Sequence, residues 1–200
     1  SLFLSRNKPP LIGLDISSTS VKVIELSKTG SGYRIEGIAV EPLPANAIVE
    51  KNIAEIETVA ESVKRALNKS KIKNKQVAIA VAGSSVITKK ITMPISLSED
   101  EMEGQILLEA DQYIPYPLEE VNLDFQILGQ TKSNPETVDV LLAACRRENV
   151  DDRVAAAELA GLTPKIVDIE AYTIESVFSS MASQKSHKDM NKTVAIVDIG

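Results

Sequence analysis

Three strand-like runs of apolar residues open the chain, at residues 11–16, 21–27 and 33–40. Short turns rich in Ser, Thr and Gly separate them, as is typical of β-strands joined by hairpins. Because turns this short connect neighbours, we predict three adjacent antiparallel strands.

The pattern changes to a helical period after the proline-rich breaker at residues 41–44. Asn52 is the expected N-cap of this helix. The run at residues 76–82 is too short and too rich in β-branched residues for a helix, and its nearly continuous apolar character predicts a strand covered on both faces. Three antiparallel strands, a helix and a buried strand form the opening of a ribonuclease H-like α/β core. One face of the helix carries the apolar residues Ile56, Val59, Ala60, Val63, Ala66 and Leu67.

A segment of different character interrupts this core. Ser98 and Glu101 form a capping box at the start of a helix, which Pro115 and Pro117 end. Two strands follow, around residues 123–127 and 138–145, and then a helix at 150–160 with Gly161 as its left-handed cap. We therefore predict a small α+β subdomain at residues 87–164, inserted into a core made of residues 1–86 and 165–200. The returning core carries a strand at 165–169, a helix with Ala171, Ile174, Phe178 and Met181 on one face, and a strand at 193–199.

The charge balance limits the partners of the chain. It has 22 basic and 28 acidic residues, a net charge of -6, so nucleic acid is not an expected partner. No apolar run approaches the roughly 20 residues of a membrane helix, and the first ten residues lack the apolar region of a signal peptide. The single cysteine, Cys145, lies in an apolar run and is expected to be buried. We predict a cytoplasmic protein without its own membrane insertion.

Two distant segments, residues 11–17 and 194–200, resemble each other. Each is an apolar strand that carries an aspartate near its end, Asp15 in the first copy and Asp198 in the second. Burying a carboxylate without a partner costs several kcal/mol, roughly, so an aspartate at a strand end is expected to face a polar site.

The first copy continues into a turn with four hydroxyl side chains and a nearby lysine. Hydroxyls and backbone N–H groups in a tight turn are suitable donors for phosphate oxygens, Asp15 is placed to hold Mg²⁺ through water, and Lys22 adds positive charge. The alternative is a plain hairpin in which the hydroxyls only satisfy the turn. The residues concerned are Ser17, Ser18, Thr19, Ser20 and Lys22.

Residues 13–22 resemble the first phosphate loop of the actin, sugar-kinase and FtsA superfamily, and residues 194–200 resemble the start of its second. The resemblance implies a site for ATP with Mg²⁺ that includes Asp15, Asp198 and Gly200. It also places Glu170 near the attacking water, as a candidate catalytic residue. The alternative for Glu170 is an ordinary acidic residue at a helix N-terminus.

Residues 41–44, 50–53 and 113–120 are similar to the FtsA and PilM family, and specifically to its PilM branch. This resemblance implies an actin-like core with an inserted α+β subdomain, followed beyond Gly200 by a second actin-like domain that this chain lacks. We expect the chain alone to bind ATP weakly or not at all. The implied function is a cytoplasmic, ATP-binding assembly protein for type IV pili and twitching motility, peripheral to the inner membrane and capable of self-association.

The implied partner is the short cytoplasmic N-terminal tail of the membrane protein PilN. An extended peptide binds in a groove with exposed strand edges and apolar pockets. We predict that the groove walls lie at a turn at residues 91–95 and at the proline-rich corner of residues 113–118; the alternative is a helix stop followed by a domain linker. The candidate groove residues are Met93, Pro94, Tyr113, Pro115, Tyr116 and Pro117.

Three other functions share parts of this pattern. A small-molecule kinase uses the same phosphate loops, but the inserted subdomain has no obvious cluster of acids and amides for a substrate. A metal-dependent nuclease needs several carboxylates at one site, and the strand at 76–82 ends without one. The third is a scaffold with a vestigial nucleotide site.

Overall fold

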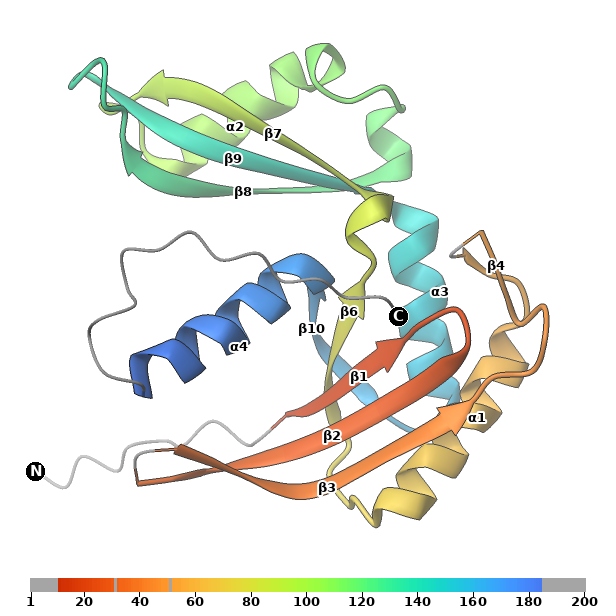
Figure 1. Cartoon of the computed structure of the whole chain (residues 1–200). Helices are drawn as coiled ribbons and strands as arrows, with labels where there is room; N and C mark the ends of the chain where they lie inside the picture. Colours follow the sequence, from red (N-terminus) through yellow and green to blue (C-terminus); the bar gives the residue numbers. More distant parts are fainter. Residues whose placement is uncertain (1–10, 31, 51, 185–200) are drawn as a thin grey trace, which may run out of the picture. The chain divides into compact units, whose positions relative to one another are not determined.

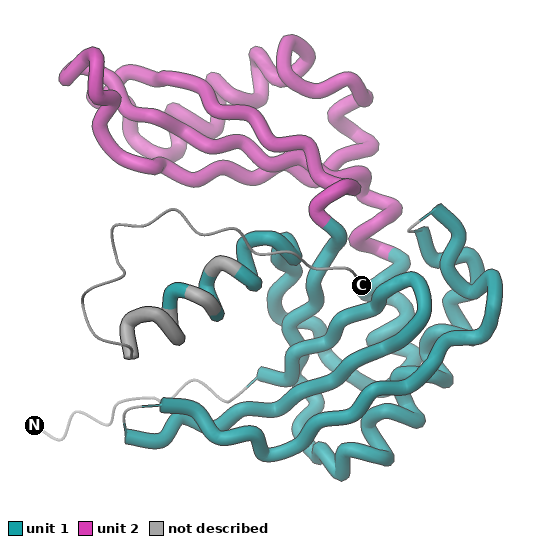
Figure 2. Tube along the Cα trace, in the orientation of Figure 1, with its two compact units in different colours: residues 1–82, 152–200 teal, residues 83–151 magenta. Residues whose placement is uncertain are grey.

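The computed structural model of the chain describes residues 11–30, 32–50 and 52–184. The chain divides into two compact units (Figure 2). Unit 1 is residues 1–82 with 152–200, and unit 2 is residues 83–151. The expected boundaries were 87 and 164, so the largest difference is that most of the helix before Gly161 belongs to unit 1.

A five-stranded sheet forms the centre of unit 1, with the order β10-β6-β1-β2-β3 (Figure 1). The first three strands pair antiparallel, and β1, β6 and β10 run parallel. This is the strand arrangement of a ribonuclease H-like core, so the predicted fold class is confirmed. The strands are β1 (Ile12–Ile16), β2 (Ser20–Thr29), β3 (Gly32–Pro42), β6 (Gln76–Val81) and β10 (Thr163–Ile169).

The alternation of β1 decides which side chains reach the core. Ile12, Leu14 and Ile16 are buried on one face, whereas Gly13 and Asp15 point to the other face and are only partly buried. A Cβ at Gly13 would lie 3.0 Å from Ile24 Cγ2 on β2, which is closer than ordinary van der Waals contact. The inner-face side chains of β1 therefore pack in the core, whereas Asp15 on the outer face of β1 remains accessible to polar groups.

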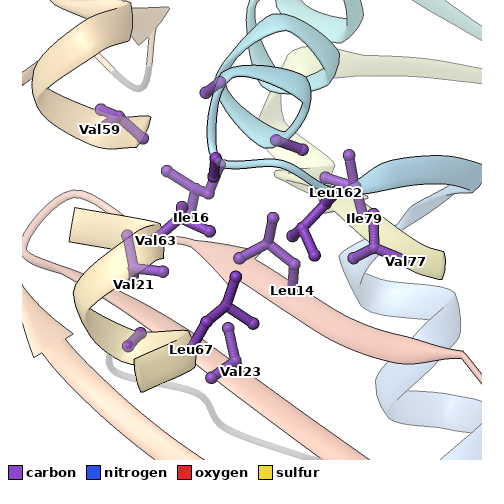
Figure 3. Packing of buried hydrophobic residues seen from close by; sticks show 14 of the residues in the cluster. Leu14, Ile16, Val21, Val23, Val59, Val63, Leu67, Val77, Ile79 and Leu162 are labelled. Carbon is purple, nitrogen blue, oxygen red and sulfur yellow. The ribbon is translucent and has the colours of Figure 1, made fainter. Parts of the chain in front are cut away.

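Two helices cover the inner face and form the core with it (Figure 3). They are α1 (Ile56–Ser70) and α3 (Arg147–Leu159). The side chains of Ala156 and Ala157 are fully buried in this core, which explains why most of α3 belongs to unit 1. The cluster includes Leu14, Val21, Val23, Val59, Val63, Leu67, Val77, Ile79 and Leu162.

The predicted N-cap of α1 is wrong. The cap residue is Glu55, which makes no side-chain capping hydrogen bond, and Asn52 lies in the short strand β5 (Asn52–Ile53). This strand pairs with β4 (Ile48–Val49), and the backbone of Ala54 then bonds to Ala47. The hairpin takes up the residues between the proline-rich breaker and the helix, so the helix begins four residues after Asn52.

Helix α4 (Glu170–Gln184) contacts β10 and β6. Figure 1 draws it on the opposite side of the sheet from α1 and α3. The predicted strand at 193–199 lies outside the described residues.

Unit 2 is a three-stranded antiparallel sheet, β7-β9-β8, with helix α2 (Glu99–Glu109) packed on one face. The capping box of Ser98 and Glu101 is confirmed, since each bonds to the backbone of the other. The predicted turn at 91–95 is wrong, because these residues up to Pro94 continue β7 and Ile91 packs on the core. The strands are β7 (Val86–Pro94), β8 (Val121–Gln130) and β9 (Thr137–Arg146), with 3-10 turns at Gly83–Ser85, Ala110–Gln112 and Leu118–Glu120.

Within the described residues, none of the helices is both long enough and apolar enough to span a membrane.

Candidate nucleotide-binding site and partner surface

The turn between β1 and β2 holds its hydroxyl groups in two different ways. Ser17 donates to the carbonyl of Ser20 through both its backbone N and its Oγ, each at 3.0 Å, and the two Oγ atoms lie 3.2 Å apart. Ser18 and Thr19, at the tip, are exposed. One pair of hydroxyls therefore closes the turn, as the plain-hairpin alternative requires, while the other pair faces solvent and is available to a ligand.

Asp15 and Lys22 stand opposite each other in the register of β1 and β2. Lys22 Nζ lies 3.2 Å from Asp15 Oδ2, and both side chains are partly exposed. An exposed pair of this kind contributes little to stability, about 0–1 kcal/mol. Both side chains are on the outer face, beside the hydroxyl turn. There the Lys22 ammonium can attract an anion, and the Asp15 carboxylate can attract a cation.

Two further acidic residues lie near the carboxyl ends of the parallel strands, as Asp15 does. Asp168 on β10 is paired with Ala80 on β6, and one further step of the β1–β6 register brings Asp15 beside Ala80. Glu170 is the first residue of α4, directly after β10. The carboxyl ends of parallel strands are where ligands bind in open α/β sheets.

Sequence reasoning did not select Asp168. Its signal was present, because it is a single carboxylate within the apolar run at the end of a strand, as Asp15 is. In the structure its Oδ1 accepts a hydrogen bond from the backbone N of Ile169 at 2.7 Å. Asp198 and Gly200 lie outside the described residues. Within the described ranges, no three Asp, Glu, His or Cys side chains come together to hold a metal ion.

The end of β3 anchors the hydroxyl turn to helix α1. The backbone N of Leu43 donates to the carbonyl of Thr19 at 2.9 Å. Two residues earlier, the buried Glu41 carboxylate accepts hydrogen bonds from Lys69 and from Arg65 Nε, the latter at 2.8 Å. The bond from Lys69, and then that from Arg65, hold the pKa of Glu41 below its usual value. These bonds hold the end of β3 against α1, and the residue that follows β3, Leu43, holds the hydroxyl turn.

The predicted groove residues of unit 2 do not lie together. Met93 is 3% exposed and packs beneath α2, so it does not line a surface. Pro94 ends β7 opposite Thr137, whereas the proline-rich corner precedes β8, whose first residue Val121 is opposite Arg146 at the other end of β9. The strands are about 30 Å long at roughly 3.3 Å per residue, which separates the two groups.

The proline-rich corner itself presents an exposed surface. Pro115, Tyr116 and Pro117 are exposed, and the ring of Tyr116 lies 6.0 Å from the guanidinium carbon of Arg146. Tyr113 is half-buried and donates to Glu109 Oε2 at 3.0 Å, a bond that raises its pKa. Tyr113 therefore acts as a fixed support, and Tyr116 with Arg146 forms the accessible part.

Comparison of the sequence and structure with known proteins identifies the family of the chain. The protein-family model described as type IV pilus assembly protein PilM matches residues 13–200. Among solved structures, a chain of the PilM–PilN type IV pilus biogenesis complex is similar, with 28% identity and a TM-score of 0.77 over 87% of this chain and 51% of that chain. This chain thus spans about half the length of that relative.

A second solved structure shares the fold alone. It is the cytoplasmic domain of EpsL, an inner membrane component of the type II secretion system of Vibrio cholerae, with 15% identity and a TM-score of 0.51 over 80% of this chain and 57% of that chain. No described feature and none of these matches favours the small-molecule kinase. With nearly its whole length matched by the family model, the chain belongs to the PilM family of type IV pilus assembly proteins.

Proposed function

We propose that this chain is the part of an ATP-binding pilus assembly protein that contains one wall of the nucleotide site and a surface for the cytoplasmic tail of PilN. The observation that carries the proposal is the similarity to a chain of the PilM–PilN complex over 87% of this chain. The geometry of the hydroxyl turn supports the nucleotide part, and the proline-rich corner supports the partner part.

The residues of the β1–β2 turn fit a magnesium nucleotide. Ser18 and Thr19 offer exposed hydroxyls to phosphate oxygens, and Lys22 offers a charge-assisted hydrogen bond. Mg²⁺ is commonly held by one or two carboxylates together with phosphates and water, and Asp15 supplies one such carboxylate. When bound, the ion would neutralise phosphate charge. Asp198 and Gly200 are proposed to complete the site from the second loop.

Two acidic residues at the sheet edge are assigned different roles. Glu170, at the start of α4, is proposed to lie nearest the terminal phosphate, as the resemblance to the superfamily implies. Asp168 is oriented by its bond to Ile169 N and is proposed to hold water around the ion. Both carboxylates are expected to act on the phosphates through water or Mg²⁺, because direct contact between like charges is unfavourable.

The proposed partner surface is the corner of Pro115, Tyr116 and Pro117 with Arg146. Tyrosine and arginine supply large contact areas and are frequent hot spots in interfaces. The corner is rigid, because the two prolines restrict the backbone and Ile114 is buried beside them. An extended peptide that binds here gains contacts without ordering the surface first.

Titration of a synthetic PilN-tail peptide into the full-length protein tests the partner role. We expect saturable binding in calorimetry, weakened by Tyr116→Ala roughly 5- to 30-fold, which corresponds to about 1–2 kcal/mol for a hot-spot residue. Lys132→Ala, an exposed position in the β8–β9 turn, is the matched control and should bind like the unmodified protein. Absence of binding at high micromolar concentration would rule out the PilN role.

A further inference from the structure

The loop between α1 and β6 concentrates positive charge on a chain whose net charge is -6. Four lysines lie within residues 69–75, and no acidic residue occurs at positions 62–98. The first of these lysines bonds to the buried carboxylate of Glu41. We call residues 71–75 the basic loop, because its three lysine side chains are exposed, at Lys71, Lys73 and Lys75.

The basic loop crosses the amino end of the parallel strands in unit 1. At one side, Ile72 packs so closely on β3 that a Cβ at Gly37 would lie 2.7 Å from its Cγ1. At the other side, the backbone N of Thr163 on β10 donates to the carbonyl of Lys75 at 2.7 Å. Lys165, also on β10, adds an exposed lysine near this end. The lysines are thus spread across the end of the sheet opposite the hydroxyl turn (Figure 1).

Distance separates this positive end from the acidic residues of the candidate nucleotide site. In the register of β1 and β6, Asp15 and Lys75 are five residue steps apart, about 16 Å at the usual rise of a strand. Exposed charges separated by more than about 8–10 Å are largely screened at physiological salt. Toward the amino end, Glu36 is bonded to Arg34, and Glu158 is an exposed acid on the last turn of α3. The local excess of lysine, and not the net charge of the chain, therefore decides what binds at this end.

The arrangement of these lysines matches a flat anionic surface better than a peptide. A peptide that adds to a sheet pairs with the edge of a strand, whereas the basic loop lies across strand ends. Leu159, in the last turn of α3, is 51% exposed toward the same end and offers an apolar contact beside the charges. Clusters of about four to eight basic residues bind anionic lipid headgroups, and each residue near the surface raises the binding constant about five-fold.

We propose that Lys71, Lys73, Lys75 and Lys165 bind the anionic headgroups of a phospholipid bilayer, so that the amino end of the unit 1 sheet faces the membrane. The chain also reaches β1 at this end, and residues 1–10 include two basic residues and no acidic one. Four lysines together give a factor of several hundred, roughly, which is weak binding for a free protein. A protein held at the membrane by the PilN tail has a high effective concentration there, so weak lipid binding then sets its orientation. The tether alone depends on the proposed PilN role.

Co-sedimentation of the full-length protein with phospholipid vesicles tests lipid binding without PilN or nucleotide. Vesicles with about 30% phosphatidylglycerol in phosphatidylcholine are compared with pure phosphatidylcholine at low salt, where surface charges are least screened. We expect binding to the anionic vesicles only, and a partition coefficient at least about 10-fold lower for Lys73→Glu/Lys75→Glu. Lys89→Glu/Lys132→Glu changes the net charge equally at exposed positions of unit 2, and it should bind like the unmodified protein.

Equal partition coefficients for the two double variants would overturn the proposal, as would equal binding to both kinds of vesicle. Binding to polyglutamate or to duplex DNA without binding to anionic vesicles would also overturn it, because the occupant would then be an acidic protein or a nucleic acid. Lys165→Glu, on β10, is a second variant should the first fail to fold, and it should lower the partition coefficient at least about 3-fold. Raising the salt concentration to about 300 mM should release the unmodified protein, and binding that resists salt would contradict an electrostatic surface.

Discussion

Single residues set how closely β3 packs on the end of helix α1, and Gly37 shows how little space there is. A Cβ at Gly37 would lie 2.7 Å from Ile72 Cγ1 and 3.0 Å from the carbonyl of Ser70, at the end of α1. We therefore expect Gly37→Ala to lower the free energy of unfolding by about 1–3 kcal/mol through overpacking. Gly32→Ala on the same strand meets nothing within 4 Å and is the control. Denaturant unfolding of both variants measures the difference, and equal destabilisation would contradict the close packing of β3 on α1.

Glu41 gives a residue-scale prediction about pH. Its pKa is lowered in the folded state by the bonds from Lys69 and Arg65, so the unfolded chain binds the proton more readily. Its contribution to stability is therefore present above the unfolded pKa of about 4.3 and is lost as pH falls through the lower folded pKa. Glu41→Gln should be less stable than the unmodified protein at pH 7, and the gap should narrow toward pH 3. A gap that is constant between pH 7 and pH 3 in thermal unfolding would show that the ion network contributes nothing.

At the scale of elements, the sequence predicted most of the fold because local patterns and tertiary packing agree. The three opening strands, the buried strand β6 and the helix that begins after Ser98 are confirmed. The cap at Gly161 is also confirmed, with a φ of 83°. The errors occurred where a short hairpin or a strand end replaced a local signal: Asn52 entered β5, and residues 91–94 extended β7 because pairing with β9 outweighs the threonine and proline in that run.

Helix α2 provides the element-scale prediction. Ser98 Oγ accepts a hydrogen bond from Glu101 N, and the Glu101 carboxylate accepts one from Ser98 N. The bond from Ser98 N lowers the pKa of Glu101. Ser98→Ala removes the side-chain half of this box and should cost about 1 kcal/mol of unfolding free energy. Glu103→Gln changes an exposed charge in the same helix without touching the cap and should have little effect. Equal stability of Ser98→Ala and the unmodified protein in chemical denaturation would show that α2 depends on packing alone.

For the molecule as a whole, the sequence predicted the candidate nucleotide site less completely than the fold. The pattern of residues 11–22 selected Asp15 and the turn hydroxyls. The register of the strands is needed to see that Asp168 lies two strands away from Asp15, also near the carboxyl end of a parallel strand. Likewise, the sequence grouped Met93 with Tyr116 as groove residues, and only the register of β7, β8 and β9 separates them. Short turns allow neighbouring strands to be paired from the sequence, whereas residues on strands that are distant in the chain are brought together only by the observed register.

The most direct test of the proposed site is calorimetry of Mg-ATP with the full-length protein carrying Asp15→Asn. The substitution keeps the shape of the side chain and removes only its charge, and the exposed pair with Lys22 contributes little to stability, so the Tm without nucleotide should hardly change. Interactions with an ionised group are worth about 1.5–3 kcal/mol, so we predict that Mg-ATP affinity falls by about 10-fold or more. Asp124→Asn in unit 2 should bind Mg-ATP like the unmodified protein. Unchanged Mg-ATP affinity in Asp15→Asn would contradict the assignment of the β1–β2 turn as the nucleotide site.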